Sequence, residues 1–138
     1  MAILAGTTTD GPGALRAFEE AGVSLDGKRV LFIGAGGAVR AVAFAVAELT
    51  RAESITVLGR TPERVRAIAE DVAANTARPV AAADLATGLA DAIAGNDILI
   101  QGTPIGMHPN PGQSPVPRQW LQPRHVCFDM VYRPNKTR

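Results

Sequence analysis

Short apolar runs alternate along this chain with longer stretches whose apolar residues recur at helical spacing. The apolar runs, such as Val-Leu-Phe-Ile and Ile-Leu-Ile, are bounded by glycine, proline and charged residues, which is typical of buried strands. The longer stretches are rich in alanine. The pattern predicts strands at residues 29–33, 54–58, 79–81, 97–100 and 125–129, and helices at residues 13–21, 37–50, 62–75 and 87–94.

This alternation of strands and helices indicates the fold class. Strands joined through helices form parallel sheets with right-handed crossovers. Continuous apolar runs indicate that both faces of the sheet are covered. We therefore predict an α/β fold, a Rossmann-like doubly wound parallel sheet in three layers, α/β/α.

Both ends of the chain look incomplete for such a fold. Residues 2–6 resemble the last part of a strand whose partners lie upstream, and the chain stops soon after its last predicted strand. We expect residues 1–24 to be the end of a strand from another domain, followed by a connecting helix. Residues 25–138 would form the α/β domain itself, cut short at the C-terminus.

Composition narrows the classes of function. With 14 basic and 13 acidic side chains among 138 residues, the net charge of +1 does not suggest a nucleic-acid or membrane-surface binder. One cysteine, Cys127, and two histidines, His108 and His125, exclude a disulfide framework and cannot alone make a zinc site, so we predict no metal. No apolar run has membrane-spanning length and no signal peptide is recognisable, so the expected location is the cytoplasm.

A proline-rich stretch from residue 102 to residue 123 interrupts the alternation. Loops of this length inside a compact domain are usually functional or disordered. We expect Trp120 to anchor this loop on the core, and Cys127 to be a small core residue.

The turn after the strand at 29–33 consists of Gly34, Ala35, Gly36, Gly37 and Ala38, and a predicted helix follows. Glycines permit a tight turn and a close approach of pyrophosphate to the backbone, and a helix N-terminus presents N–H groups to phosphate oxygens. The strict fingerprint is not met, because the next position is valine. We interpret the turn as a dinucleotide-binding loop; the alternative is a strand–helix turn that needs small residues for packing alone.

The end of the next strand indicates which dinucleotide is bound. An NAD site places Asp or Glu there, where it binds the ribose 2′-hydroxyl. Here Gly59 is followed by Arg60, Thr61 and, within the next helix, Arg64. Guanidinium groups bind phosphate bidentately, so we predict NADP(H) with its 2′-phosphate on these three side chains. The alternative is a solvated arginine face on a helix.

Five segments together carry a family likeness. They are Thr-Thr-Asp-Gly at 8–11, Gly-Ala-Gly-Gly-Ala-Val-Arg at 34–40, Gly-Arg-Thr-Pro-Glu-Arg at 59–64, Thr-Pro-Ile-Gly-Met at 103–107, and Asp-Met-Val-Tyr at 129–132 followed by Lys-Thr. In this order they resemble the C-terminal NADP-binding domain of shikimate dehydrogenases, most of all the dehydrogenase half of enzymes fused to dehydroquinate dehydratase. Thr8, Gly59 and Pro104 depart from the family's usual Asn, Asn and Ser.

The resemblance implies reversible, NADPH-dependent reduction of 3-dehydroshikimate to shikimate, a step of aromatic amino-acid biosynthesis. By motif, Asp10 would be the catalytic aspartate that binds a substrate hydroxyl and holds the family's catalytic lysine. An N-cap for the helix at 13–21 is the alternative for Asp10. Thr8 and Tyr132 would also contact the substrate, unless Tyr132 is simply half-buried.

The same resemblance assigns the nicotinamide side of the cofactor. Gly102, Thr103, Pro104 and Met107 would line the nicotinamide and its ribose. Met130 and Val131 would pack on the nicotinamide ring, although apolar residues at a strand end can equally be core.

The family's catalytic lysine belongs to an N-terminal substrate domain that has no counterpart here. Lys28 precedes the first strand of the predicted domain, away from the ligand crevice, and Lys136 follows the last strand. We therefore expect this chain alone to be inactive. Alternatives are a quinate/shikimate dehydrogenase domain, a methylene-tetrahydrofolate dehydrogenase of like topology, or an NADP-binding regulatory module without catalysis.

Overall fold

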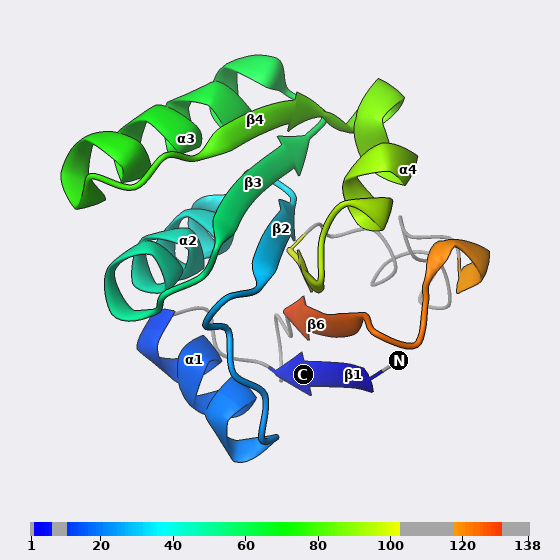
Figure 1. Ribbon diagram of the computed structural model, residues 1–138. Coiled ribbons are helices and arrows are strands. Elements are labelled where there is room, and N and C mark those ends of the chain that lie inside the picture. Colours follow the sequence, from blue (N-terminus) through cyan, green and yellow to red (C-terminus); the bar gives the residue numbers. More distant parts are fainter. Residues whose placement is uncertain (1, 7–10, 103–117, 131–138) are drawn as a thin grey trace, which may run out of the picture.

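The computed structural model describes residues 2–6, 11–102 and 118–130. Within these ranges the chain forms a central sheet with helices packed on it (Figure 1). The strands are β1 (Ala2–Gly6), β2 (Arg29–Ile33), β3 (Ser54–Gly59), β4 (Ala81–Asp84), β5 (Ile98–Gln101) and β6 (Val126–Met130). The helices are α1 (Gly11–Glu20), α2 (Gly37–Leu49), α3 (Pro62–Thr76), α4 (Leu85–Ala94) and the short 3-10 helix η1 (Arg118–Trp120).

The sheet is parallel throughout, in the order β1-β6-β5-β2-β3-β4. From β2 the chain proceeds outward through β3 to β4, then returns to the other side of β2 with β5 and β6. This confirms the predicted doubly wound sheet. Its topological switch point, where ligands bind in such folds, lies between the carboxyl ends of β2 and β5.

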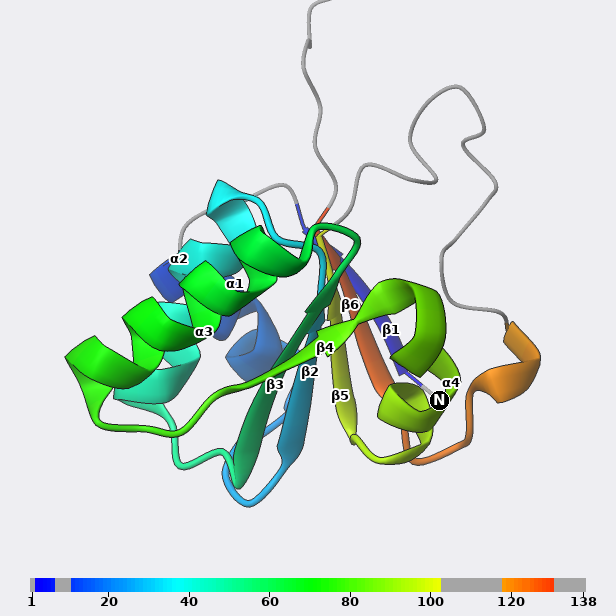
Figure 2. The same ribbon diagram turned by 90° about the horizontal axis from the view of Figure 1, so that it is seen from above.

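Helices cover both faces of this sheet. Helices α1, α2 and α3 lie on one face, and α4 with η1 lies on the other (Figure 2). Val30 and Phe32 of β2 belong to the core under the three helices, whereas Leu31 and Ile33 belong to the core under α4. Because successive strand side chains point to opposite faces, a continuous apolar run is buried from both sides.

Strand β1 and helix α1 are part of this layered structure. Strand β1 pairs in parallel with β6, so one of its partners lies within this chain and not upstream. The buried ring of Phe18 in α1 lies 5.0 Å from that of Phe128 in β6. Helix α1 therefore shares its core with the sheet, and the boundary between residues 24 and 25 stays a prediction.

One predicted strand was misplaced: the strand expected at 79–81 lies at Ala81–Asp84. Pro79 has no N–H to donate to a ladder. The guanidinium of Arg78 donates to the carbonyls of Ala47 (3.0 Å) and Thr50 (3.1 Å) and to that of Ala52, which ties residue 78 to the end of α2. The ladder therefore begins later, with Ala81 paired to Thr56. The other predicted elements match the observed bounds to within two residues.

Candidate functional site

The candidate site lies at the carboxyl ends of β2 and β5. Two backbone hydrogen bonds hold the loops there: the N–H of Gly34 donates to the carbonyl of Leu58 at 2.7 Å, and that of Gly102 to the carbonyl of Ile33 at 2.8 Å. The first bond ties the turn after β2 to β3, and the second ties the end of β5 to β2. The loops that would receive a ligand are therefore fixed by the sheet itself.

The turn after β2 has the conformation and the open space that a phosphate group needs. Gly34 adopts φ +122°, a conformation that favours glycine. Gly36 and Gly37 do not adopt positive φ, and a Cβ atom at either position would meet nothing within 4 Å. Neither packing nor backbone conformation requires these two exposed glycines. Small residues there leave the backbone open to a ligand, as the dinucleotide-binding interpretation expects.

Helix α2 begins directly at this open turn. Its N-cap is Gly36, which provides no side-chain hydrogen bond to the first turn, and that turn contains no acidic residue. Ala35 and Ala38 flank the glycines and are half-buried. The first N–H groups of the helix and the positive end of its dipole thus face the crevice without a competing carboxylate, which favours binding of an anion.

Arginines gather at the neighbouring strand end. Arg60, Thr61 and Arg64 are all exposed where β3 passes into α3. Thr61 is the N-cap of α3 and directly precedes Pro62, but its hydroxyl makes no capping hydrogen bond. The acidic residue closest to this point in sequence is the exposed Glu63, in the first turn of α3. This donor set fits a phosphate group.

An ion pair joins helices α2 and α3, which begin at the glycine turn and at the arginines. The guanidinium of Arg40 in α2 lies 2.7 Å from the carboxylate of Asp71 in α3 and 4.8 Å from the centroid of the Phe44 ring. Both charged side chains are about half exposed, so the pair contributes modestly to stability. It does connect the glycine-loop helix with the arginine-bearing helix.

Comparison with known proteins agrees with this arrangement. The profile of the family "Shikimate / quinate 5-dehydrogenase" matches residues 14–108. The chain belongs to this family. The "Shikimate dehydrogenase (NADP(+))" of Moorella thermoacetica is 39% identical over 136 residues, which cover 98% of this chain and 46% of that protein. The enzyme of the same name from Methanothermobacter thermautotrophicus is 42% identical over 137 residues, covering 96% of this chain and 46% of its own.

Solved structures of the family share the fold. Shikimate 5-dehydrogenase from Listeria monocytogenes, in complex with shikimate and NAD, has a TM-score of 0.80 at 32% identity and covers 94% of this chain and 47% of its own. Quinate dehydrogenase from Corynebacterium glutamicum, in complex with NAD, has a TM-score of 0.78 at 31% identity, with coverages of 91% and 44%. The chain spans less than half the length of the curated relatives it matches.

The family motifs fall only partly within the described residues. Gly102, which directly precedes the motif at 103–107, packs closely: a Cβ there would lie 2.5 Å from Cγ2 of Val39 and 2.7 Å from Cε of Met130. Met130 is 6% exposed and belongs to the core under α1 to α3, as the alternative interpretation expected. Its contact with a nicotinamide ring stays a prediction. Outside the described residues lie Thr8, Asp10, Thr103, Pro104, Met107, Val131 and Tyr132.

Sequence reasoning gave no role to one carboxylate at this edge. Asp129 is half-buried near the end of β6, in register with Gln101 of β5. Burial raises the pKa of its carboxyl group above the ordinary value. The signal in the sequence was an acidic residue within an otherwise apolar strand end.

Three other residues that the sequence analysis named lie away from the candidate site. His125 is fully buried; its Nδ1 accepts the N–H of Gln122 at 2.9 Å, and its Nε2 donates to the carbonyl of Ile93 at 2.9 Å. Cys127 packs against the core under α4, and burial raises the pKa of its thiol. Trp120 is 38% exposed, and its neighbour Leu121 packs against the core under α4. That Trp120 anchors the loop stays a prediction, because residues 103–117 lie outside the described residues.

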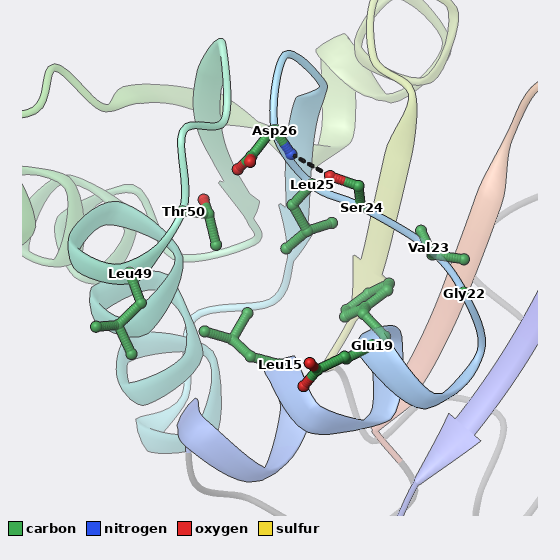
Figure 3. Close-up of a pocket in the computed structure, with 10 residues that line it drawn as sticks. Leu15, Glu19, Gly22, Val23, Ser24, Leu25, Asp26, Leu49 and Thr50 are labelled. Atoms are coloured by element: carbon green, nitrogen blue, oxygen red, sulfur yellow. Dashed lines mark hydrogen bonds between the residues drawn. The ribbon is translucent and has the colours of Figure 1, made fainter.

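A pocket of about 460 Å³ lies at the opposite end of the sheet, where α1 approaches the end of α2 (Figure 3). Leu15, Leu25 and Leu49 line it together with Glu19 and Asp26. Since dinucleotides bind at the carboxyl ends of parallel strands, this pocket is separate from the candidate cofactor site. Among the described residues there is no cluster of three metal-ligating side chains, and no helix there is long and apolar enough to cross a membrane.

Proposed function

We propose that this chain binds NADP(H) as the cofactor domain of a shikimate dehydrogenase. The observation that carries the proposal is the juxtaposition at the crevice: the open backbone of Gly36 and Gly37 begins α2, and the exposed Arg60 and Arg64 stand at the next strand end without an acid on that strand. The names of the Moorella and Methanothermobacter relatives support NADP as the cofactor.

In this proposal the two ends of the nucleotide are held by different elements. The backbone of residues 34–38 and the first turn of α2 bind the pyrophosphate, which NAD and NADP share. Arg60, Arg64 and the unused hydroxyl of Thr61 bind the 2′-phosphate, which only NADP carries. Gly102, Thr103, Pro104 and Met107, with Met130 and Val131, line the nicotinamide end.

Bound NADPH would donate the hydride when 3-dehydroshikimate is reduced, bound NADP(+) would accept it when shikimate is oxidised, and the protein would orient the cofactor. On the substrate side, Asp10 accepts a hydrogen bond from a substrate hydroxyl and orients the lysine that carries the proton, while Thr8 and Tyr132 bind the substrate. Neither lysine of this chain is proposed for that role: Lys28 lies just before β2, at the far end of the sheet from the crevice, and Lys136 lies outside the described residues.

The test of cofactor binding is a melting series of the wild-type chain and Arg60→Ala with each cofactor. A ligand at a hundred times its dissociation constant stabilises a fold by about 2.7 kcal/mol, and at this size raises the melting temperature by about 5–10 °C. We expect NADP(+) to give the larger shift, and Arg60→Ala to weaken NADP(+) by about 10–100-fold with little effect on NAD(+).

The matched control is Arg66→Ala, which removes an exposed arginine from the same helix. It should leave both cofactor shifts near wild type. Equal shifts from the two cofactors in wild type, or equal losses in the two arginine variants, would show that Arg60 is only a solvated charge of α3.

The expectation of inactivity is tested separately, with shikimate and with quinate. Loss of a general acid–base group alone slows a reaction by about 10²–10⁴-fold, and loss of substrate positioning slows it further. We expect no turnover of either substrate by this chain at high protein concentration. Typical enzyme rates with shikimate would contradict that expectation. Faster turnover of quinate would support the second candidate, a quinate dehydrogenase, because this chain is similar to the quinate dehydrogenase of Corynebacterium glutamicum.

A further inference from the structure

Gly59, the last residue of β3, has no room for a side chain in the packed structure. Gly59 does not adopt positive φ, so its backbone conformation would accept any residue. A Cβ built on Gly59 would lie 2.7 Å from Cγ2 of Val65, 3.4 Å from Cβ of Ala35 and 3.7 Å from the carbonyl carbon of Gly34. Only the contact with Val65 is shorter than packed carbon atoms allow. Val65 therefore makes the contact that most strongly opposes a side chain at position 59.

Val65 has little freedom to move away. It is 1% exposed and belongs to the core that α1, α2 and α3 form on the sheet. Its N–H donates to the carbonyl of Thr61 at 3.1 Å in the first turn of α3, and a valine in a helix keeps one strongly preferred side-chain rotamer. Helix α3 is in turn tied to α2 by the ion pair between Arg40 and Asp71. A side chain at position 59 must therefore displace a helix rather than a flexible chain end.

Position 59 bears on cofactor choice because it lies at the end of the second strand of the dinucleotide-binding fold. In dinucleotide-binding folds the end of this second strand, about 20 residues after the glycine loop, bears the Asp or Glu that hydrogen-bonds the ribose 2′-hydroxyl of NAD. Such a carboxylate would also repel a 2′-phosphate. Relatives of this chain include enzymes named for NADP(+) and structures in complex with NAD, so cofactor choice varies among proteins similar to it.

We propose that Val65, by keeping position 59 free of a side chain, makes a switch of this site toward NAD(H) depend on two substitutions, an acid at position 59 and a smaller residue at position 65. In the wild-type chain the arginines attract the 2′-phosphate, whereas Val65 opposes a substitution at position 59 that would introduce a repelling carboxylate. The inference rests on the proposed function, because it concerns the cofactor that this same site would bind.

The steric part is tested without any ligand by a double-mutant cycle of Gly59→Ala and Val65→Ala. Gly59→Ala adds only the Cβ atom, and we expect it to lower the melting temperature by at least about 5 °C through overpacking. Val65→Ala removes the opposing methyl groups and has a smaller cost of its own. The double variant should melt above the sum of the two single effects. Additive losses, or a Gly59→Ala chain that melts like wild type, would overturn the contact as the reason for glycine.

The specificity part uses Gly59→Asp and Gly59→Asn, each combined with Val65→Ala. Asp and Asn have the same shape, so their comparison isolates the charge. We expect the Asp double variant to bind NADP(+) about 10–100-fold more weakly than the Asn double variant and to give the larger melting shift with NAD(+). Val65→Ala alone should keep the wild-type preference for NADP(+).

Two results would refute the proposal. Gly59→Asp in the presence of Val65 could fold like wild type and prefer NAD(+), or the Asp double variant could still prefer NADP(+). A wild-type chain that shifts with neither cofactor would instead refute the proposed function, and the selection argument with it. The ligand-free cycle still reports the contact in that case, so the two failures are distinguishable.

Discussion

Replacing Asp97 by asparagine tests the charge network at the amino ends of the central strands, far from the candidate cofactor site. The carboxylate of Asp97, just before β5, accepts hydrogen bonds from the backbone N–H of Arg29 (2.9 Å) and from Nε (3.1 Å) and Nη2 (3.0 Å) of the same residue. It accepts a fourth from Nη1 of Arg124 at 2.9 Å. The network joins β2, β5 and the segment leading into β6.

The size of the effect follows from these contacts. Asparagine has the same shape as aspartate, but its amide group would turn N–H donors toward at least one guanidinium. Hydrogen bonds to charged groups contribute about 1.5–3 kcal/mol each, but Arg29 and Arg124 are 40% and 37% exposed, so solvent screens their share. We expect Asp97→Asn to lower the free energy of unfolding by about 2 kcal/mol at pH 7, and the melting temperature by about 5–10 °C.

The dependence on pH identifies the charge as the cause. The hydrogen bonds of Arg29, followed by the charges of Arg29 and Arg124, hold the pKa of Asp97 well below its ordinary value. A folded-state pKa below the unfolded one gives a stabilisation that is complete above the unfolded pKa of about 3.9 and is lost as the pH falls below it. The melting gap between wild type and Asp97→Asn should therefore be full at pH 7 and shrink below about pH 4.

A gap that stays constant from pH 7 to pH 3, or one below about 1 °C at pH 7, would show that the carboxylate charge is not the cause. The matched control is Asp71→Asn, which breaks a single ion pair whose side chains are 49% and 51% exposed. It should lower the melting temperature much less than Asp97→Asn does. The shift on adding NADP(+) should be the same in Asp97→Asn as in wild type, since the site lies at the other end of the strands.

Two further substitutions test the packing around the site and of the first helix. Gly102→Ala would place a Cβ 2.5 Å from Cγ2 of Val39, at the start of α2, so we expect a loss of about 1–3 kcal/mol in urea unfolding and a smaller NADP(+) shift. An unchanged urea midpoint would mean that the loop adjusts freely. Phe18→Ala should cost about 3–5 kcal/mol and retain one cooperative transition, because the Phe18 ring packs on Phe128 of β6. Two separate transitions would instead assign α1 to another unit.

The elements that the sequence predicted best are those with both faces buried. The bounds of β2 were predicted without error and those of β3 to within one residue, since their apolar runs end at glycine or at charged residues. The edge strand β4 was misplaced, because its Ala-Ala-Ala-Asp sequence carries no periodic pattern and its position depends on a distant contact of Arg78. The pairing of β1 with β6 joins opposite ends of the chain, which no local pattern reveals.

The candidate site was predictable where its chemistry is local. The glycine turn, the start of α2 and the exposed Arg60 and Arg64 lie where the strand–turn–helix pattern places them. The reason for glycine at position 59 could not be read from the sequence, because Val65 opposes it from the next helix. The neighbours of Met130 were likewise invisible until β5, β6 and α2 were brought together.

In the proposed function, binding of a dinucleotide and choice between dinucleotides depend on different parts of this fold. The glycine turn is held to β3 by the hydrogen bond of Gly34, and the loop after β5 is held to β2 by that of Gly102. The arginines and Val65 belong to α3 or lie at its start, and α3 is positioned by packing on the sheet and by its ion pair with α2. We therefore expect a substitution in the first turn of α3 to affect the groups proposed for the 2′-phosphate more than the turn proposed for the pyrophosphate. Such a division allows a family to vary its cofactor while keeping one phosphate-binding turn.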